Sequence, residues 1–309
     1  MPEQTKSEEQ KKIKKVSPKL DIVFKIIFGE KGSENITKDF LEKILKRKIE
    51  KIELEKNPIL AQEFEEDKLG ILDILTELEG KEKCNIELQI VNRHNIVERI
   101  LYYWARMYTK QLKAGEYYDK LEKTIVILIS DFSIKGLEEL GYHSTWKIME
   151  TENSKKLILT DKFEIDIIEL SKIKGKENEK DQLLDWLMFL ENPESERVIR
   201  KMEENENLKE AVEKLDYINS DEHKQRIIEL REKAIRDERA IYLQGIEDGE
   251  ERGKIEGRLE GKIEGKIEGK LEGAKEKQIE IAKNMLKENI SIEVIFKITG
   301  LTKEEIEKL

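Results

Sequence analysis

The sequence predicts a mixed α/β domain followed by a mainly helical C-terminal extension. Between about residues 20 and 190, helix patterns and strand patterns follow in the order helix, helix, three strands, helix, strand. The run TIVILISDF is almost continuously apolar, which is typical of a strand buried on both faces of a sheet. From about residue 205 the chain is strongly charged and poor in large apolar residues, so we expect it to leave the globular body.

The predicted elements follow one another along the chain with turn residues between them. Ser17-Pro18 starts the first helix and Gly29 ends it, and the break at Asn192-Pro193 separates later helices. The other elements are a helix at 35–48, strands at 51–55, 68–79 and 83–91, a helix that starts at 94 and ends at Gly115, strands at 124–132, 143–150 and 157–170, and helices over 181–245. The predicted organisation is a disordered basic arm (1–17), an α/β domain (18–190), a helical region (191–245), a glycine-repeat helix or linker (246–275) and a C-terminal helical hairpin (276–309).

Composition restricts the functional classes. The chain has 309 residues with 58 Lys and Arg against 68 Asp and Glu, a net charge of −10, so any nucleic-acid partner requires a local binding site. There is no apolar run long enough to span a bilayer, and the N-terminus lacks the apolar core of a signal peptide. The single cysteine, Cys84, fits a reducing compartment. We therefore expect a cytoplasmic protein without a membrane partner.

The two strand patterns around Gly80 predict a hairpin that carries acidic residues. If the turn is centred on Gly80, paired residue numbers sum to 160, and Asp73 lies directly opposite Glu87. Alternation puts Glu87 and Gln89 on a polar face, while the apolar residues between them hold this register. Facing carboxylates destabilise a sheet unless a cation lies between them, so Asp73 and Glu87 are candidate Mg²⁺ ligands. The alternative is a solvated sheet face that happens to be acidic.

The same residues carry a family resemblance. The segments SPKLDIVFKIIFG, LDILTELEGKEKCNIELQ and TIVILISDF, with the helix that contains Arg99 and Tyr102, resemble the Rpn family of recombination-promoting nucleases and PD-(D/E)XK transposases. The resemblance covers about residues 17–135. It implies a PD-(D/E)XK restriction-endonuclease-like core with the element order α-β-β-β-α-β. It also implies Mg²⁺-dependent DNA endonuclease chemistry, with Mn²⁺ or Ca²⁺ as alternative ions.

The resemblance also implies roles for individual residues. Asp73 matches the motif aspartate, Glu87 the acidic residue of the third strand, and Asp21 and Lys25 a segment of the first helix. Gln89 stands where the general motif has lysine, and a neutral amide can hydrogen-bond but cannot offset negative charge. We expect a variant motif rather than an inactive site. The missing cation is then Lys25, Lys83 or Arg99.

The helix after the hairpin carries candidate DNA contacts. Arg99, Tyr102, Tyr103 and Arg106 share one helical face, where arginine contacts to phosphate with aromatic support are one interpretation. In the other interpretation, the tyrosines pack inward and both arginines reach solvent. We favour this second interpretation for Tyr103 and Arg106. Arg99, Tyr102 and Lys83 remain the DNA-binding candidates. Sequence spacing predicts no histidine ligand set, and Cys84 is predicted to be a core residue.

Glycine recurs every four residues from Gly249 to Gly273. The seven glycines cost an isolated helix about 1 kcal/mol each relative to alanine. We considered a helix with right-handed supercoiling, a strand and a flexible linker, and favour the helix because helical sequence flanks it. A helix of this kind predicts homo-oligomerisation through the repeat, as in a coiled coil.

The last segment predicts two short helices. Gly300 ends the first, and Thr302 with Glu305 forms a capping box for the second. The pattern resembles a helix-turn-helix, but residues 290–309 hold three lysines against four glutamates, so we favour a tail cap or dimerisation element.

Three functions are therefore compared. The first is a metal-dependent DNA endonuclease that hydrolyses phosphodiester bonds. The second is a catalytically inactive nuclease-like protein that acts as an oligomerising module, and the third is a helix-turn-helix DNA-binding module. We favour the endonuclease because the hairpin register and the family resemblance identify the same two carboxylates. Transposition, recombination and antiviral defence are all compatible with such an activity.

Overall fold

The computed structural model describes residues 16–55, 74–92, 95–152 and 155–309, without the side chain of Glu238. The chain divides into an N-terminal unit that ends at Lys233 and a C-terminal unit, Ala234–Leu309. The N-terminal unit is a mixed α/β domain built on a six-stranded sheet with the strand order β1-β2-β3-β4-β6-β5. This confirms the predicted fold class.

The strands occupy the predicted segments. β3, β4 and β6 are parallel and form the centre of the sheet, whereas β1, β2 and β5 run antiparallel to their neighbours. The bounds are β1 (Ile52–Leu54), β2 (Ile74–Leu78), β3 (Glu82–Gln89), β4 (Thr124–Ser130), β5 (His143–Trp146) and β6 (Phe163–Glu169). All of β4 is buried, as its continuous apolar run predicts.

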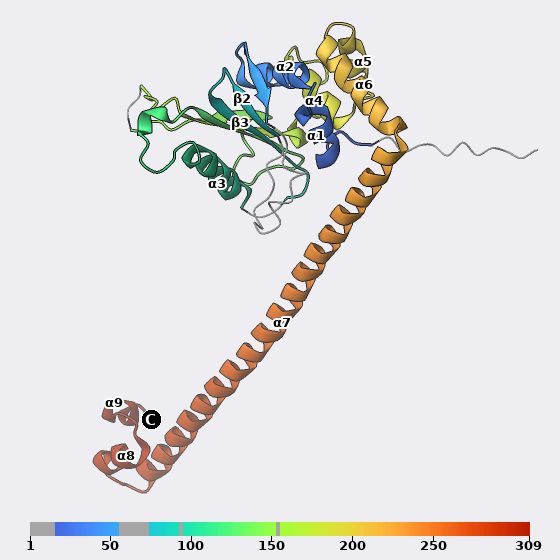
Figure 1. Ribbon diagram of the computed structural model, residues 1–309. Coiled ribbons are helices and arrows are strands. Elements are labelled where there is room, and N and C mark those ends of the chain that lie inside the picture. The colour runs from blue at the N-terminus through green and yellow to red at the C-terminus, as the bar shows by residue number, and fades with distance from the viewer. Residues whose placement is uncertain (1–15, 56–73, 93–94, 153–154) are drawn as a thin grey trace, which may run out of the picture. The chain divides into compact units, whose positions relative to one another are not determined.

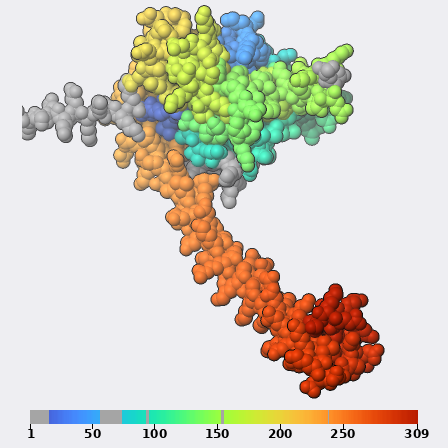
Figure 2. Space-filling view, turned by 180° about the vertical axis from the view of Figure 1, so that it is seen from behind, coloured from blue at the N-terminus to red at the C-terminus, as the bar shows by residue number. Residues whose placement is uncertain are grey.

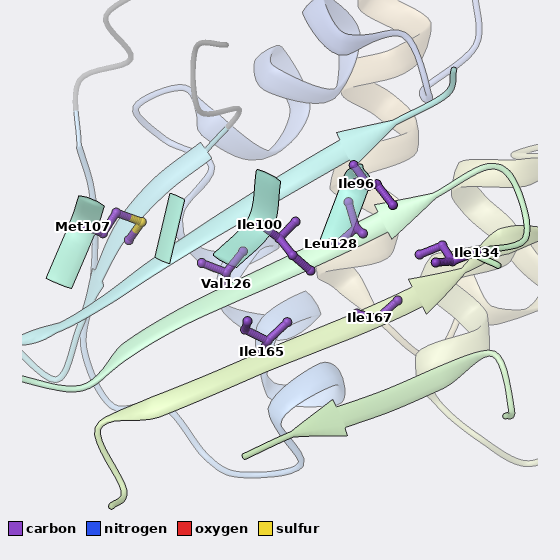
Figure 3. Close-up of a cluster of buried hydrophobic side chains, with 8 residues drawn as sticks. All are labelled: Ile96, Ile100, Met107, Val126, Leu128, Ile134, Ile165 and Ile167. Carbon is purple, nitrogen blue, oxygen red and sulfur yellow. The ribbon is translucent and has the colours of Figure 1, made fainter. Parts of the chain in front are cut away.

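Helices cover both faces of this sheet. Figure 1 shows α3 (Ile96–Thr109) on one side and α1 (Asp21–Gly29), α2 (Glu34–Leu45) and α4 (Leu183–Glu191) on the other. An apolar cluster joins α3 to β4 and β6, and Figure 3 shows its side chains between helix and sheet: Ile96, Ile100, Met107, Val126, Leu128, Ile134, Ile165 and Ile167. On the other side, the rings of Phe28, Phe40 and Trp186 are in mutual contact.

Two details of the helices differ from the prediction. α3 ends at Thr109 rather than Gly115. After Lys110 the backbone changes to longer i−3 hydrogen bonds, from Gln111 to Tyr108 and from Leu112 to Thr109, both 3.4 Å. The charged segment from residue 205 does not leave the globular body at once. The short helix α5 (Glu196–Met202) is followed by α6 (Glu206–Ser220), which contacts α1 and α2. α6 buries four apolar residues, Leu208, Ala211, Leu215 and Ile218. Only four apolar positions on one helical face are needed for this packing, so the high overall charge concealed it.

The glycine repeat is helical. It lies in α7 (Glu222–Lys287), a continuous helix of 66 residues. Ile255, Leu259, Ile263, Ile267 and Leu271 are all more than half exposed. Figures 1 and 2 view this segment from opposite sides, and neither shows another part of the C-terminal unit against it.

The end of the chain forms a small helical module. The last turns of α7 pack with α8 (Ile292–Thr299) and α9 (Lys303–Glu307) around Ala282, Ile295, Leu301 and Ile306. Gly300 ends α8 in the left-handed conformation, with φ 71°, and Thr302 and Glu305 form the capping box of α9. Both features were predicted from the sequence. No helix in the described parts of the chain is long and apolar enough to cross a membrane.

Candidate functional site

The hairpin of β2 and β3 has the predicted register. Ile74 pairs with Ile86 and Leu78 with Glu82, so paired residue numbers sum to 160. Glu79 and Gly80 form the turn with φ of 54° and 71°, the left-handed backbone that tight hairpin turns require. Asp73, the predicted partner of Glu87, lies outside the described residues.

Glu87 is buried on the sheet face that α3 covers. In register, Glu87 pairs with Leu128 of β4, and Leu128 belongs to the apolar cluster beneath α3. The side chain of Glu87 is only 2% exposed. The predicted polar face of the hairpin therefore exists, but it is covered rather than solvated. A buried carboxylate is costly unless charges or hydrogen bonds compensate it.

Gln89 and Arg99 supply that compensation. Gln89 Nε2 donates to Glu87 Oε1 at 2.9 Å. Arg99 Nη2 lies 3.6 Å from the same oxygen, and Arg99 Nη1 lies 3.4 Å from Gln89 Oε1. The three side chains come from the end of β3 and the first turn of α3. They place one carboxylate, one amide and one guanidinium in mutual contact.

Tyr103 holds Arg99 in this position. Arg99 Nη2 donates to the Tyr103 hydroxyl at 3.1 Å, and the guanidinium carbon lies 5.6 Å from the centre of the Tyr103 ring. Tyr103 is buried, at 5% exposure, whereas its neighbour Tyr102 is 46% exposed. The inward packing predicted for Tyr103 is correct. Its hydroxyl contact with Arg99 was missed, although the i, i+4 spacing allowed it.

Of the other predicted site residues, Asp21 and Lys83 have partners outside this contact set. Asp21, at the start of α1, accepts from the guanidinium of Arg231, with 2.8 Å between Nε and Oδ2. Lys25 is buried in α1 at 8% exposure. Lys83 lies near the start of β3 and donates to Glu77 at 2.7 Å and to Glu55 at 3.0 Å. Partial burial opposes the charge on Lys83, but these two hydrogen bonds raise its pKa above the ordinary value.

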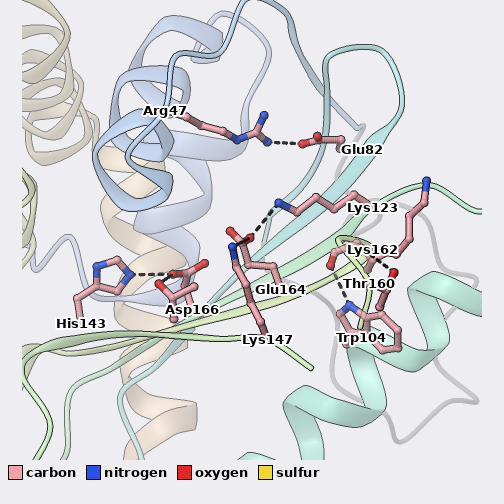
Figure 4. A network of polar contacts seen from close by, with 12 residues as sticks. Arg47, Glu82, Trp104, Lys123, His143, Lys147, Thr160, Lys162, Glu164 and Asp166 are labelled. Atoms are coloured by element: carbon pink, nitrogen blue, oxygen red, sulfur yellow. Dashed lines mark hydrogen bonds and ion pairs between the residues drawn. The ribbon is translucent and has the colours of Figure 1, made fainter. Parts of the chain in front are cut away.

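A second polar network occupies the opposite face of the sheet. Asp166 lies between Ile165 and Ile167 in β6 and accepts from His143 at 2.8 Å and from Thr145 at 2.7 Å. Figure 4 shows this pair with two ion pairs of Glu164, which contacts Lys123 at 2.9 Å and Lys147 at 3.4 Å. Because Glu87 projects from the other face, this network is not part of its site.

Cys84 also lies away from the site. It is fully buried on the face opposite Glu87, as its place in the strand alternation predicts. Burial, followed by the charges of Asp166 and Glu164, raises the pKa of the thiol far above its ordinary value. A thiol held in the neutral form is a core residue and not a nucleophile.

Comparison with known families identifies the domain. Residues 18–244 match the model of the PD-(D/E)XK nuclease family transposases. The chain belongs to this family. Residues 275–309 match the C-terminal helix-turn-helix domain of the Rpn/YhgA-like nuclease family. The second match favours the helix-turn-helix interpretation of α8 and α9 over the tail cap that their charge suggested. No curated protein and no solved structure matches the chain.

The described residues fit part of an ion site. Among them, no group of three or more His, Cys, Asp or Glu side chains is placed to hold a metal ion. Glu87 supplies a carboxylate oxygen, the ligand type that Mg²⁺ and Mn²⁺ prefer. The second carboxylate predicted for this ion, that of Asp73, lies outside the described residues.

Proposed function

We propose that the protein is a metal-dependent DNA endonuclease that hydrolyses phosphodiester bonds. The contact set of Glu87, Gln89 and Arg99 is the observation that carries this proposal. Glu87 and Gln89 stand at the positions that the sequence resemblance assigns to the motif, in a chain of the PD-(D/E)XK family, and Arg99 supplies a cation beside them. Family membership supports a nuclease or transposase-related role. Metal dependence and the catalytic residues are the parts that we propose.

In this proposal Asp73 and Glu87 hold the divalent ion. The register of the described hairpin, continued by one pair beyond Ile74 and Ile86, would set Asp73 opposite Glu87. Mg²⁺ is commonly held by two carboxylates, with water and substrate phosphate as the remaining ligands. Mn²⁺ and Ca²⁺ use the same oxygen donors. The ion, when bound, polarises the phosphoryl oxygen and activates a water for attack.

Arg99 takes the electrostatic role of the missing motif lysine. Gln89 is neutral, and Lys83 is engaged with Glu77 and Glu55. Arg99 is the cation that contacts both Glu87 and Gln89 in the described site. Its side chain is about a quarter exposed, so we propose that the guanidinium reaches a phosphate while Tyr103 holds it in place. In the reaction, we propose that Arg99 stabilises the negative charge that develops on the phosphoryl oxygens.

DNA is the proposed substrate and partner. The C-terminal match to a helix-turn-helix domain suggests DNA binding. Tyr102, exposed one position before Tyr103, is proposed to stack on or support the DNA beside Arg99. Lys83 is proposed as a weaker phosphate contact because two glutamates already bind its ammonium group. Asp21 and Lys25 are proposed to support the site from α1.

Plasmid cleavage by the full chain tests the endonuclease proposal. We expect the wild type to nick or cut supercoiled DNA in Mg²⁺ or Mn²⁺ and to lose this activity in chelator. Glu87→Ala and Asp73→Ala should abolish cleavage, whereas Glu53→Ala, which removes an exposed acid of the neighbouring strand, should leave it unchanged. Cleavage by Glu87→Ala at the wild-type rate would contradict the proposal.

A second candidate function is assembly through α7. The exposed apolar row of the repeat favours it, because a helix that leaves five large aliphatic residues more than half exposed has apolar surface to bury against a partner. A second copy of this chain is the proposed partner. Ile263→Glu should convert an oligomer to monomers in light scattering, and Lys266→Gln is the matched control outside the apolar row. A wild-type chain that is monomeric at high concentration would contradict this assembly.

A further inference from the structure

Asn85 is a buried polar residue whose side-chain amide makes no hydrogen bond to any residue that the structure describes. Its side chain is 0% exposed, and neither Nδ2 nor Oδ1 has a hydrogen-bond partner among the described residues. An asparagine amide has two donor hydrogens and an acceptor oxygen. Leaving these groups unpaired in an apolar interior costs free energy, so such a residue in a folded protein calls for a specific explanation.

The position of Asn85 relates it to the proposed ion site. Asn85, Glu87 and Gln89 alternate along β3 and therefore project from the same face of the sheet. In register, Asn85 pairs with Leu75 of β2 and Val126 of β4. Figure 3 shows Val126 beneath α3, close to Ile100. The neighbours of Asn85 in the sheet are thus apolar, and an aliphatic side chain would satisfy packing alone better than an amide.

We infer that Asn85 is a positioning residue of the ion site, and that its amide oxygen accepts a hydrogen bond from a water bound to the ion that Glu87 holds. This inference rests on the proposed endonuclease function. Two residues of strand separate Asn85 from Glu87 by about 7 Å, a distance that one ion-bound water can bridge. Mg²⁺ keeps several of its waters when bound to protein, and groups that orient such waters tune its affinity.

Thr76 provides a matched control for this inference. It lies in β2, is also 0% exposed, and its hydroxyl also has no hydrogen-bond partner among the described residues. Thr76 pairs with Cys84 and therefore projects from the sheet face opposite Asn85 and Glu87. Removing the Thr76 hydroxyl therefore shows how much Mn²⁺ affinity changes when an equally buried polar group is lost on the face away from the site.

The experiment is Mn²⁺ titration of the full chain by calorimetry, with thermal unfolding measured in chelator. Asn85→Leu, which is close in size but cannot hydrogen-bond, should bind Mn²⁺ about 10–100-fold more weakly than the wild type. Its melting temperature in chelator should equal or exceed that of the wild type. Asn85→Ser keeps an acceptor and leaves room for water, so it should retain most of the affinity. Thr76→Val should bind Mn²⁺ as the wild type does.

Three outcomes would overturn the inference. Wild-type Mn²⁺ affinity in Asn85→Leu would show that Asn85 has no part in the ion site, while the endonuclease proposal would stand. An equal loss of affinity in Asn85→Leu and Thr76→Val would assign the effect to core packing. If the wild-type chain binds no Mn²⁺, and its titration is the same as that of Glu87→Ala, both the proposed function and this inference are overturned.

Discussion

Replacing Arg99 tests how strongly the candidate site depends on a single cation. Arg99 Nη2 lies 3.6 Å from Glu87 Oε1, and at an effective dielectric constant of about 20 two unit charges at this separation attract each other by about 5 kcal/mol. The arginine side chain is 25% exposed while the glutamate is 2% exposed, so solvent screens part of this attraction. We expect a net coupling of about 1–3 kcal/mol, between the values for exposed and buried ion pairs.

The assay is a double-mutant cycle measured by urea unfolding in chelator. Arg99→Met should destabilise the wild type by more than it destabilises Glu87→Gln, because the methionine leaves a buried carboxylate without its cation. Arg99→Met should also slow DNA cleavage by about 10²–10³-fold, the usual cost of removing one charge-stabilising donor from an active site. Arg99→Lys, which keeps the charge but not the planar guanidinium, should be intermediate.

Additive effects of Arg99→Met and Glu87→Gln on the free energy of unfolding would refute the electrostatic reasoning. The contact would then resemble an exposed ion pair of negligible strength. Undiminished cleavage by Arg99→Met would separately remove Arg99 from the catalytic role that we propose for it.

Two further predictions concern the hairpin and the repeat helix. Folding raises the pKa of Lys83 above its ordinary value of 10.5. Its ion pairs should therefore stabilise the fold fully below that pH and lose this contribution as the pH rises through the folded-state pKa. The melting temperatures of the wild type and Lys83→Met should therefore differ at pH 8 and converge in strong alkali; a constant difference would contradict this assignment. In α7, nothing lies within 4 Å of the position that a Cβ would take at Gly261 or Gly265. Each alanine should stabilise the helix by about 1 kcal/mol, so the double alanine variant should show more helix by circular dichroism. The same variant should associate more weakly, because added side chains prevent two glycine rows from approaching closely. Unchanged helicity would contradict the first expectation, and unchanged association the second.

The hairpin illustrates how far the sequence predicts local structure. Gly80 and the alternation of Ile86 and Leu88 with Glu87 and Gln89 determine both the turn and the register, and the structure has the same pairing. These are interactions between segments close in the chain, where turn chemistry and the two-residue strand period are sufficient. The capping box at Thr302 was predictable for the same reason.

The surroundings of Glu87 depended on packing that the sequence pattern does not encode. The residue pattern of β3 indicates a polar face around Glu87 and is compatible with a solvated one. In the structure α3 covers this face and the carboxylate is buried. Arg99 and Gln89 were both candidates from the sequence, yet their contact follows from the docking of α3 on the sheet. Asn85 gave no functional signal beyond its place on the same strand face, because the sequence does not show that its buried amide lacks a hydrogen-bond partner among the described residues.

The most direct test of the ion site is a crystal structure of the full chain with Mn²⁺, in which the anomalous signal locates the ion. We expect one strong anomalous peak within coordination distance of carboxylate oxygens of both Asp73 and Glu87, with Arg99 within reach of the waters bound to the ion. A structure in which the carboxylates of Asp73 and Glu87 point to opposite faces of the sheet, or in which Mn²⁺ binds without Glu87, would contradict it.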